Sequence, residues 1–256
     1  MEYNVLSYGA VGDGAVLDTK AIQQAIDRCV HYFIYAKGGE NIRITGFGTI
    51  DGSEERYYGV QGRYHISGCS LVSTSSAIKI GTESEDDFEH VIIENCHISR
   101  SNRGLSFQLR DKGSIRDVWI SNLNIETRRF SKEWWGRAEP IYITVCDRKE
   151  GVRAGRIEHV RLQNISCHSE SGIFIYGSEG HEIKDLELRD IHVVMEKQSK
   201  WPCDSYDLRP CEGEGIRPSE LYGLYAEGTQ NLKLSGITIE CRESMREYVG
   251  GERKIL

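Results

Sequence analysis

Long apolar stretches are missing from this sequence. No run among its 256 residues approaches the ~18 apolar residues that a membrane-spanning helix needs, so we expect no membrane partner. The first residues, Met1-Glu2-Tyr3-Asn4, lack the basic region and apolar core of a secretory signal peptide. The chain as given is therefore predicted to be cytoplasmic, or secreted or periplasmic if a leader has been removed from it.

Motifs for metals and phosphates are also missing. None of the eight cysteines forms a CxxC pair, and the glycine-rich stretch before residue 15 contains no GxGxxG, GKS or GKT. We therefore predict no metal site and no cofactor. Cys69, Cys96 and Cys167 occupy apolar positions and are interpreted as small buried residues. Cys203 and Cys211 fall in one predicted loop and would be able to pair in an oxidising compartment.

Positive charge is in the minority, because 32 Lys and Arg face 39 Asp and Glu and give a net charge of −7. Proteins that bind nucleic acid are usually basic, so we expect no nucleic-acid partner. The net charge also fits poorly with an anionic ligand, although a total says nothing about the charge in one groove. Proline is scarce too, at 4 residues against 27 glycines, and this balance favours a turn-rich all-β chain.

The sequence does contain a recurring phrase, apolar–x–apolar–x–(Asn, Gly or Asp)–apolar–x–apolar. In residues 91–98, for example, apolar residues alternate on both sides of Asn95. The second apolar residue of each copy lies at position 44, 66, 93, 120, 162, 188 or 234. Most steps are between 22 and 27 residues, and two are longer, at 42 and 46. A period in the twenties with alternation at every second residue is typical of stacked strands and not of helices.

The fold prediction follows from this alternation. Alternate residues of a strand point to one face, so each apolar residue faces a core and each x faces solvent. The central Asn, Gly or Asp is expected at a corner, because these residues tolerate the left-handed backbone region. No coil buries its apolar face alone, so the coils must stack. We predict an all-β, single-stranded right-handed parallel β-helix, in which the two long steps are coils with inserted loops.

A single domain is predicted for residues 1–256. It would consist of an N-terminal segment with a capping helix (1–40), the coils (41–240) and a C-terminal tail (241–256). The helix is expected over residues 18–30, where a capping Asp precedes apolar residues at helical spacing. This helix would cover the open end of the stack, where core and strand edges otherwise meet water. The sequence does not indicate an oligomeric state.

Several phrases resemble family 28 glycoside hydrolases, the polygalacturonases and their relatives. They are Asn41–Gly52, Ser76–Ser84, Asn102–Leu105, Trp134–Ile141 and Tyr206–Pro210, and the likeness extends over nearly the whole chain. The resemblance implies a pectin-type β-helix enzyme that hydrolyses α-linked uronic-acid polymers with inversion. Inversion requires one carboxylic acid to protonate the leaving oxygen and one carboxylate to activate water. The implied partner is therefore a poly- or oligosaccharide that contains uronic acid.

The sequence departs from that family where its chemistry lies. Between Gly52 and Ile80 it lacks the family's Asn-Thr-Asp and Asp-Asp phrases, so the chain is internally shortened, and Ser76 stands where the family's histidine would be. We assign no catalytic residue and expect little or no hydrolysis of polygalacturonate. The alternatives are a non-catalytic glycan-binding β-helix and, as a third option, a purely structural solenoid or a sequence shortened by an error in the gene assignment, which would bind nothing.

Seven residues are predicted to bind the saccharide. Lys79, Arg103 and Arg110 lie at or beside the second strands of successive coils, and they would bind a uronate carboxylate. An inserted loop would form a groove wall, in which a Trp face stacks on a sugar ring. Each of these residues also fits an ordinary surface or packing role. The complete set is Lys79, Glu83, Arg103, Gln108, Arg110, Trp135 and Glu139.

Overall fold

The computed structural model describes residues 5–11, 20, 21, 24 and 64–256. The chain divides into two compact units, and the larger one holds residues 41–50 and 58–256. In the smaller unit a 3-10 helix, η1 (Val5–Tyr8), is described. The helix predicted over residues 18–30 and the repeat copy at residue 44 fall almost wholly outside the described residues. Both stay predictions, as does the single domain.

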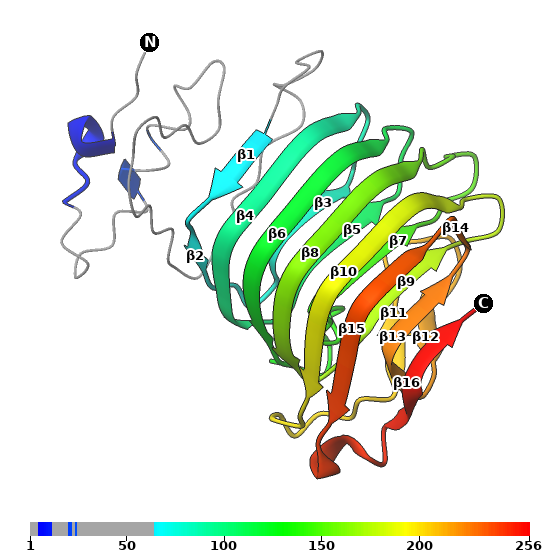
Figure 1. Cartoon of the computed structure of the whole chain (residues 1–256). Helices are drawn as coiled ribbons and strands as arrows, with labels where there is room; N and C mark the ends of the chain where they lie inside the picture. The colour runs from blue at the N-terminus through cyan, green and yellow to red at the C-terminus, as the bar shows by residue number, and fades with distance from the viewer. Residues whose placement is uncertain (1–4, 12–19, 22–23, 25–63) are drawn as a thin grey trace. The chain divides into compact units, whose positions relative to one another are not determined.

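A long parallel sheet forms one wall of the larger unit (Figure 1). Its neighbours in space follow the order β1-β4-β6-β8-β10, with β2 beside β4 and both β14 and β15 beside β10. Each strand is therefore hydrogen-bonded to the matching strand of the next coil. The strands are β1 (Tyr64–Ser67), β2 (Ser70–Leu71), β4 (Phe88–Ser101), β6 (Ile115–Thr127), β8 (Ile157–Ser169), β10 (Ile183–Met195), β14 (Thr229–Gln230) and β15 (Lys233–Cys241).

A second parallel sheet forms the opposite wall, in the order β16-β13-β9-β7-β5-β3. The chain alternates between the two sheets as it advances from coil to coil, which is the parallel β-helix that the repeat predicts. An antiparallel pair, β11 (Ser205–Asp207) and β12 (Ile216–Pro218), stands apart from both sheets. The strands of the second sheet are β3 (Ser76–Thr82), β5 (Arg103–Leu109), β7 (Ile141–Val145), β9 (Ile173–Gly177), β13 (Leu221–Glu227) and β16 (Val249–Ile255).

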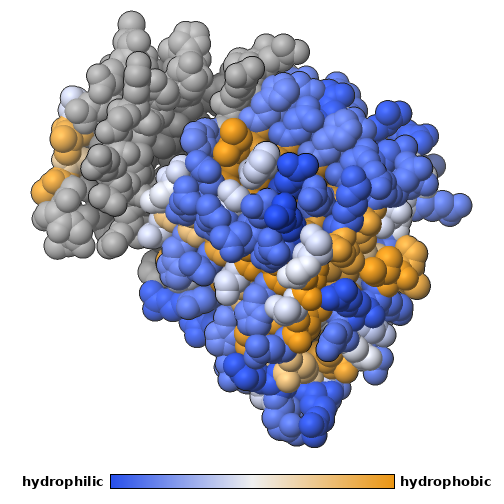
Figure 2. Space-filling view, viewed as in Figure 1, coloured by the Kyte–Doolittle hydropathy of each residue, from blue (hydrophilic) through white to orange (hydrophobic). Residues whose placement is uncertain are grey.

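The register of the first sheet follows the sequence repeat. The second apolar residue of each described copy falls on one ladder, and its four central members are fully buried. Positions between the apolar residues are mostly exposed or partly exposed, as alternation requires. In the view of Figure 2, hydrophilic residues cover much of the described surface, and apolar residues gather in a band across the middle. The ladder runs through Ile66, Ile93, Ile120, Leu162, Leu188 and Leu234.

The central polar residue of each copy adopts the left-handed backbone conformation. Asn95, Asn122 and Asn164 have φ of 56°, 57° and 53°, and Asp190 and Gly236 follow at 52° and 62°. The side-chain amide of Asn122 donates to Oδ1 of Asn95 at 3.0 Å, and that of Asn164 donates to Oδ1 of Asn122 at 2.7 Å. The repeated polar residue thus turns the chain and links successive coils.

A second left-handed column lies five residues earlier in each coil, and the sequence analysis did not identify it. Its φ values run from 51° to 58°. Ion-pair contacts cross this column, with His159 3.3 Å from Asp117 and 3.6 Å from Asp185. The members are His90, Asp117, His159, Asp185 and Asn231.

The C-terminal residues continue the fold. The sequence analysis assigned residues 241–256 to a tail, but they contain a 3-10 helix, η3 (Glu243–Met245), and strand β16. Leu224 of β13 lies opposite Arg253 of β16 in parallel register. The segment was missed because its apolar residues are too few to repeat the full phrase, while its backbone still completes the second sheet.

Candidate functional site

The outer face of the second sheet is the surface on which the sequence analysis placed the groove. Residues that point outward from successive strands form a row across this face. The row contains Lys79, Ser106, Tyr142, Phe174 and Tyr225. Lys79 is exposed, whereas the middle of the row is buried. Strands β5 and β7 are buried on both faces, so another part of the chain covers them.

The covering part is the long insertion between β10 and β13, residues 196–220, which we call the cover. The ring of Tyr206 stacks on Phe174 with centroids 4.0 Å apart. The hydroxyl of Tyr142 donates to the backbone oxygen of Asp207 at 2.7 Å. The two long steps in the repeat are thus inserted loops, as predicted, but the cover packs onto the sheet face and does not leave an open groove there.

Arg103 and Glu139 form a buried ion pair beneath the cover. Arg103 donates from Nε and Nη2 to the two carboxylate oxygens at 2.8 and 3.2 Å, and its guanidinium lies 3.7 Å from the Tyr142 ring centroid. Burial disfavours the charge on Arg103, but Glu139, Tyr142 and Asp207 together outweigh this effect, and the pKa of Arg103 lies above its usual value. The charged groups of Arg103 and Glu139 are therefore paired with each other, and their burial disfavours the predicted contact with a saccharide.

Arg110 has a similar structural role at the other end of β5. It is fully buried and donates to the backbone oxygens of Leu208 and Pro210 at 2.9 and 2.8 Å, and to Oγ1 of Thr144 at 2.9 Å. Its guanidinium therefore fastens the cover to the sheet instead of facing solvent. Gln108 is buried nearby on the same strand.

The predicted residues do not converge on one site. Arg103 and Arg110 are seven residues apart on an extended strand, about 23 Å along the backbone. Trp135 and Glu139 gather near Arg103, whose Nη2 donates to the Trp135 backbone oxygen at 3.3 Å. Glu83 pairs with Arg148 at 2.8 Å, and the backbone nitrogen of Arg148 donates to the oxygen of Arg110 at 3.2 Å, so Glu83 lies towards Arg110. The sequence places Arg103 and Arg110 at or beside the second strands of the coils, but it contains no information on how long these strands are or on what packs over them.

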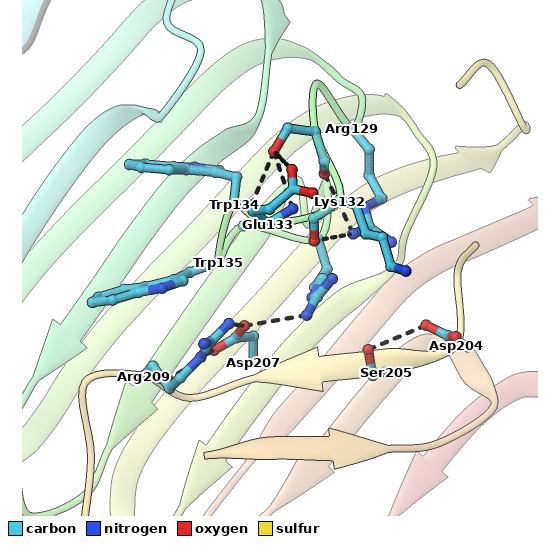
Figure 3. A network of polar contacts seen from close by, with 12 residues as sticks. Arg129, Lys132, Glu133, Trp134, Trp135, Asp204, Ser205, Asp207 and Arg209 are labelled. Carbon is cyan, nitrogen blue, oxygen red and sulfur yellow. Dashed lines mark hydrogen bonds and ion pairs between the residues drawn. The ribbon is translucent and has the colours of Figure 1, made fainter. Parts of the chain in front are cut away.

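The exposed part of this region is formed by Trp134, Trp135 and Arg209. The two indoles are 45% and 43% exposed, and Figure 3 shows both rings extending to the same side, away from the polar contacts. The Arg209 guanidinium lies 5.4 Å from the Trp135 ring centroid. We call these three residues the Trp–Arg surface.

A buried carboxylate fixes Arg209 in place. Asp207 is fully buried, and its oxygens accept hydrogen bonds from Nε and Nη2 of Arg209 at 2.9 and 2.6 Å. Arg137 contributes a weaker contact to the same carboxylate at 3.4 Å. The hydrogen bonds from Arg209 to Asp207 raise the pKa of Arg209 above its usual value, so the guanidinium stays charged.

Charged side chains are concentrated where the cover meets the second sheet. Four guanidinium groups contact the cover or its buried carboxylate, and two carboxylates are buried among them. The guanidinium groups belong to Arg103, Arg110, Arg137 and Arg209, and the carboxylates to Glu139 and Asp207.

Sequence reasoning missed Asp207 and Arg209 as parts of the site. Both lie in the phrase Tyr206–Pro210, which was noted only for its family resemblance. That resemblance was the one available signal, because the insertion has no repeat and its contacts join residues about a hundred positions apart in the sequence.

In residues 64–256 and the few described before them, no three His, Cys, Asp or Glu side chains are grouped to hold a metal ion. No helix in the described part of the chain is long and apolar enough to cross a membrane.

Comparison with known proteins gives one similarity. The chain is 34% identical over 110 residues to mannuronan C5-epimerase AlgE2 from Azotobacter vinelandii. The match covers 41% of this chain and 10% of the epimerase, so the chain spans about a tenth of that protein's length. No protein-family model and no solved structure matches. The resemblance to family 28 glycoside hydrolases therefore stays a prediction.

Proposed function

We propose that this chain binds a uronic-acid polysaccharide at the Trp–Arg surface without hydrolysing it. The observation that carries the proposal is the exposed Trp135 ring beside Arg209, whose guanidinium is fixed by Asp207. The similarity to an epimerase named for mannuronan supports this ligand class, because mannuronan is a polymer of a uronic acid.

The chemistry of the surface matches the two sides of a uronic-acid unit. An aromatic face packs against the apolar face of a sugar ring, and a guanidinium binds a carboxylate through paired hydrogen bonds. Asp207 takes donors from Nε and Nη2 of Arg209, and this leaves the Nη1 donors for a ligand. Because Arg209 is already ordered, little side-chain entropy is lost when a ligand binds.

Binding is tested by titration calorimetry with oligogalacturonides and oligomannuronates. Trp135→Ala should weaken binding about tenfold, which corresponds to about 1.4 kcal/mol. Trp119→Ala is the matched control, because Trp119 is equally exposed at 46% and lies 5.1 Å from Arg161 on the outer face of the first sheet. Equal losses in the two variants, or no binding by the unaltered chain, would refute the proposal.

Inverting hydrolysis of the same polymer is the second candidate, favoured by the phrases that resemble polygalacturonases. The buried ion pair of Arg103 and Glu139 and the cover over the second sheet support binding without turnover. Release of reducing ends from polygalacturonate, abolished by changing a single carboxylate of this chain, would establish hydrolysis instead.

A further inference from the structure

Two cysteines meet where the cover joins the second sheet. Cys146 directly follows β7 and is 5% exposed, and Cys211 lies in the cover and is partly exposed. One residue beyond each, the backbone nitrogen of Glu212 donates to the oxygen of Asp147 at 2.9 Å. The two thiols interact, and each shifts the pKa of the other. Cys203, which the sequence places in the same loop as Cys211, is buried beside a different set of side chains, among them Lys197 and Glu170.

Charged groups around the thiols favour one thiolate. The hydrogen bond from Cys146 lowers the pKa of Cys211 to about 7, burial opposes this effect, and the Arg110 guanidinium assists it. Asp207 raises the pKa of Cys211, whereas Arg209 lowers it, as Arg110 does. The hydrogen bond to Cys211 and burial raise the pKa of Cys146, so Cys146 retains its proton.

We infer that Cys146 and Cys211 are an oxidation site, at which a small-molecule disulfide converts the two thiols into one disulfide that fastens the cover to the second sheet. The Cys211 thiolate attacks one sulfur of the oxidant, which forms a mixed disulfide and releases one thiolate. Cys146 then loses its proton and attacks the Cys211 sulfur, which releases the second thiolate. Both electrons pass to the oxidant, whose disulfide is reduced to two thiols.

The positions of the two residues suit this order of events. Cys211 is accessible to a molecule in solution, whereas the burial of Cys146 restricts its sulfur to a partner within the protein. Arg110 holds Leu208 and Pro210 against the sheet, so the second thiol is already aligned when the first has reacted. The bond would prevent the cover from separating from β7.

The test treats the folded chain with oxidised glutathione, alkylates the remaining thiols and maps the peptides by mass spectrometry. We expect a disulfide between the peptides of Cys146 and Cys211, loss of the free thiol at both of these positions, and slower proteolysis within residues 196–220. The rate of oxidation should rise through about pH 7, where Cys211 ionises. Reduction with dithiothreitol should restore both thiols and the original rate of proteolysis.

Single variants separate this pair from the other cysteines. Cys146→Ser should leave a stable glutathione adduct on Cys211, and Cys203→Ala should form the same disulfide as the unaltered chain. Exposed Cys241 serves as an internal comparison that gains an adduct but no intramolecular bond. Pairing of Cys211 with Cys203, a lasting adduct on Cys211 in the unaltered chain, or no reaction at Cys211 would each overturn the inference. It does not depend on saccharide binding, so the two tests fail independently.

Discussion

At the scale of single residues, the structure depends on side chains that tolerate a left-handed backbone. Asn95, Asn122 and Asn164 occupy matching corners of successive coils with φ between 53° and 57°. Asparagine suits this position for two reasons, because it accepts the backbone conformation and its amide reaches the next asparagine. The same residue therefore determines both the direction of the chain and the spacing of the coils.

Replacing the central asparagine separates these two contributions. Asn122→Ala should lower the free energy of unfolding by about 1–2 kcal/mol, because alanine is strained at positive φ. Asn122→Gly removes the same amide hydrogen bonds, but glycine adopts the left-handed backbone without strain, so this variant should cost less. Urea denaturation measures both variants. Equal losses would mean that the amide ladder, and not the backbone, supplies the stability.

At the scale of elements, the cover is the segment that closes one face of this β-helix. Its first residues are held by Glu170, a fully buried carboxylate that accepts hydrogen bonds from the backbone nitrogens of Arg129 and Gln198, both at 2.6 Å, and of Ser199. Lys197 adds an ion pair at 3.1 Å. One side chain thus joins the loop after β6 to the start of the cover.

This carboxylate predicts a pH dependence. Burial disfavours the charge on Glu170, but the backbone donors and Lys197 outweigh it and lower its pKa below the usual 4.5. The pKa of Glu170 is lower in the folded state than in the unfolded state. The stabilisation is therefore complete at pH values above the unfolded-state pKa and is lost as the pH falls through the folded-state pKa. Glu170→Gln should therefore cost about 1–3 kcal/mol at neutral pH and flatten the acid limb of the stability curve.

Thermal melting between pH 3 and 7 would measure this effect. Exposed Glu179→Gln is the matched control and should leave the curve unchanged. An acid limb that is as steep in Glu170→Gln as in the unaltered chain would show that other carboxylates determine it.

At the scale of the whole molecule, stability is distributed along a stack. Each coil contacts its neighbours through the register of both sheets, so the free energy of unfolding is close to a sum over coils and their interfaces. Burial along the ladder differs between central and terminal coils, because Leu162 in a central coil is fully buried whereas Leu234 in β15 is only partly buried.

The position of a coil should therefore determine the cost of the same substitution. Leu162→Ala is expected to lower the free energy of unfolding by about 2–5 kcal/mol, since it leaves a cavity between two packed neighbours. Leu234→Ala, at the matching position of the ladder, should cost clearly less. Urea denaturation compares them, and equal costs would contradict a stack in which central coils are the more tightly packed.

The binding residues were harder to predict than the coils. Trp135 and Glu139 were predicted from the sequence to lie in an inserted loop that forms a groove wall, and the structure places both beside Arg103. Their exposure was not predictable, because the sequence analysis treated Arg103 and Trp135 alike, whereas the structure buries one and exposes the other. The difference arises from the cover, which lies over Arg103 and leaves the Trp135 ring in solvent.

The sequence by itself determined the coils of this protein, because alternation and the left-handed corner are local properties that repeat from one copy to the next. Only the tertiary structure decided which face of the stack is accessible. The contacts that cover the second sheet join Arg103 to Asp207 and Arg110 to Pro210, across about a hundred residues of chain. A segment without a repeat has no periodic pattern that indicates where it packs, so only the folded structure shows its position on the sheet.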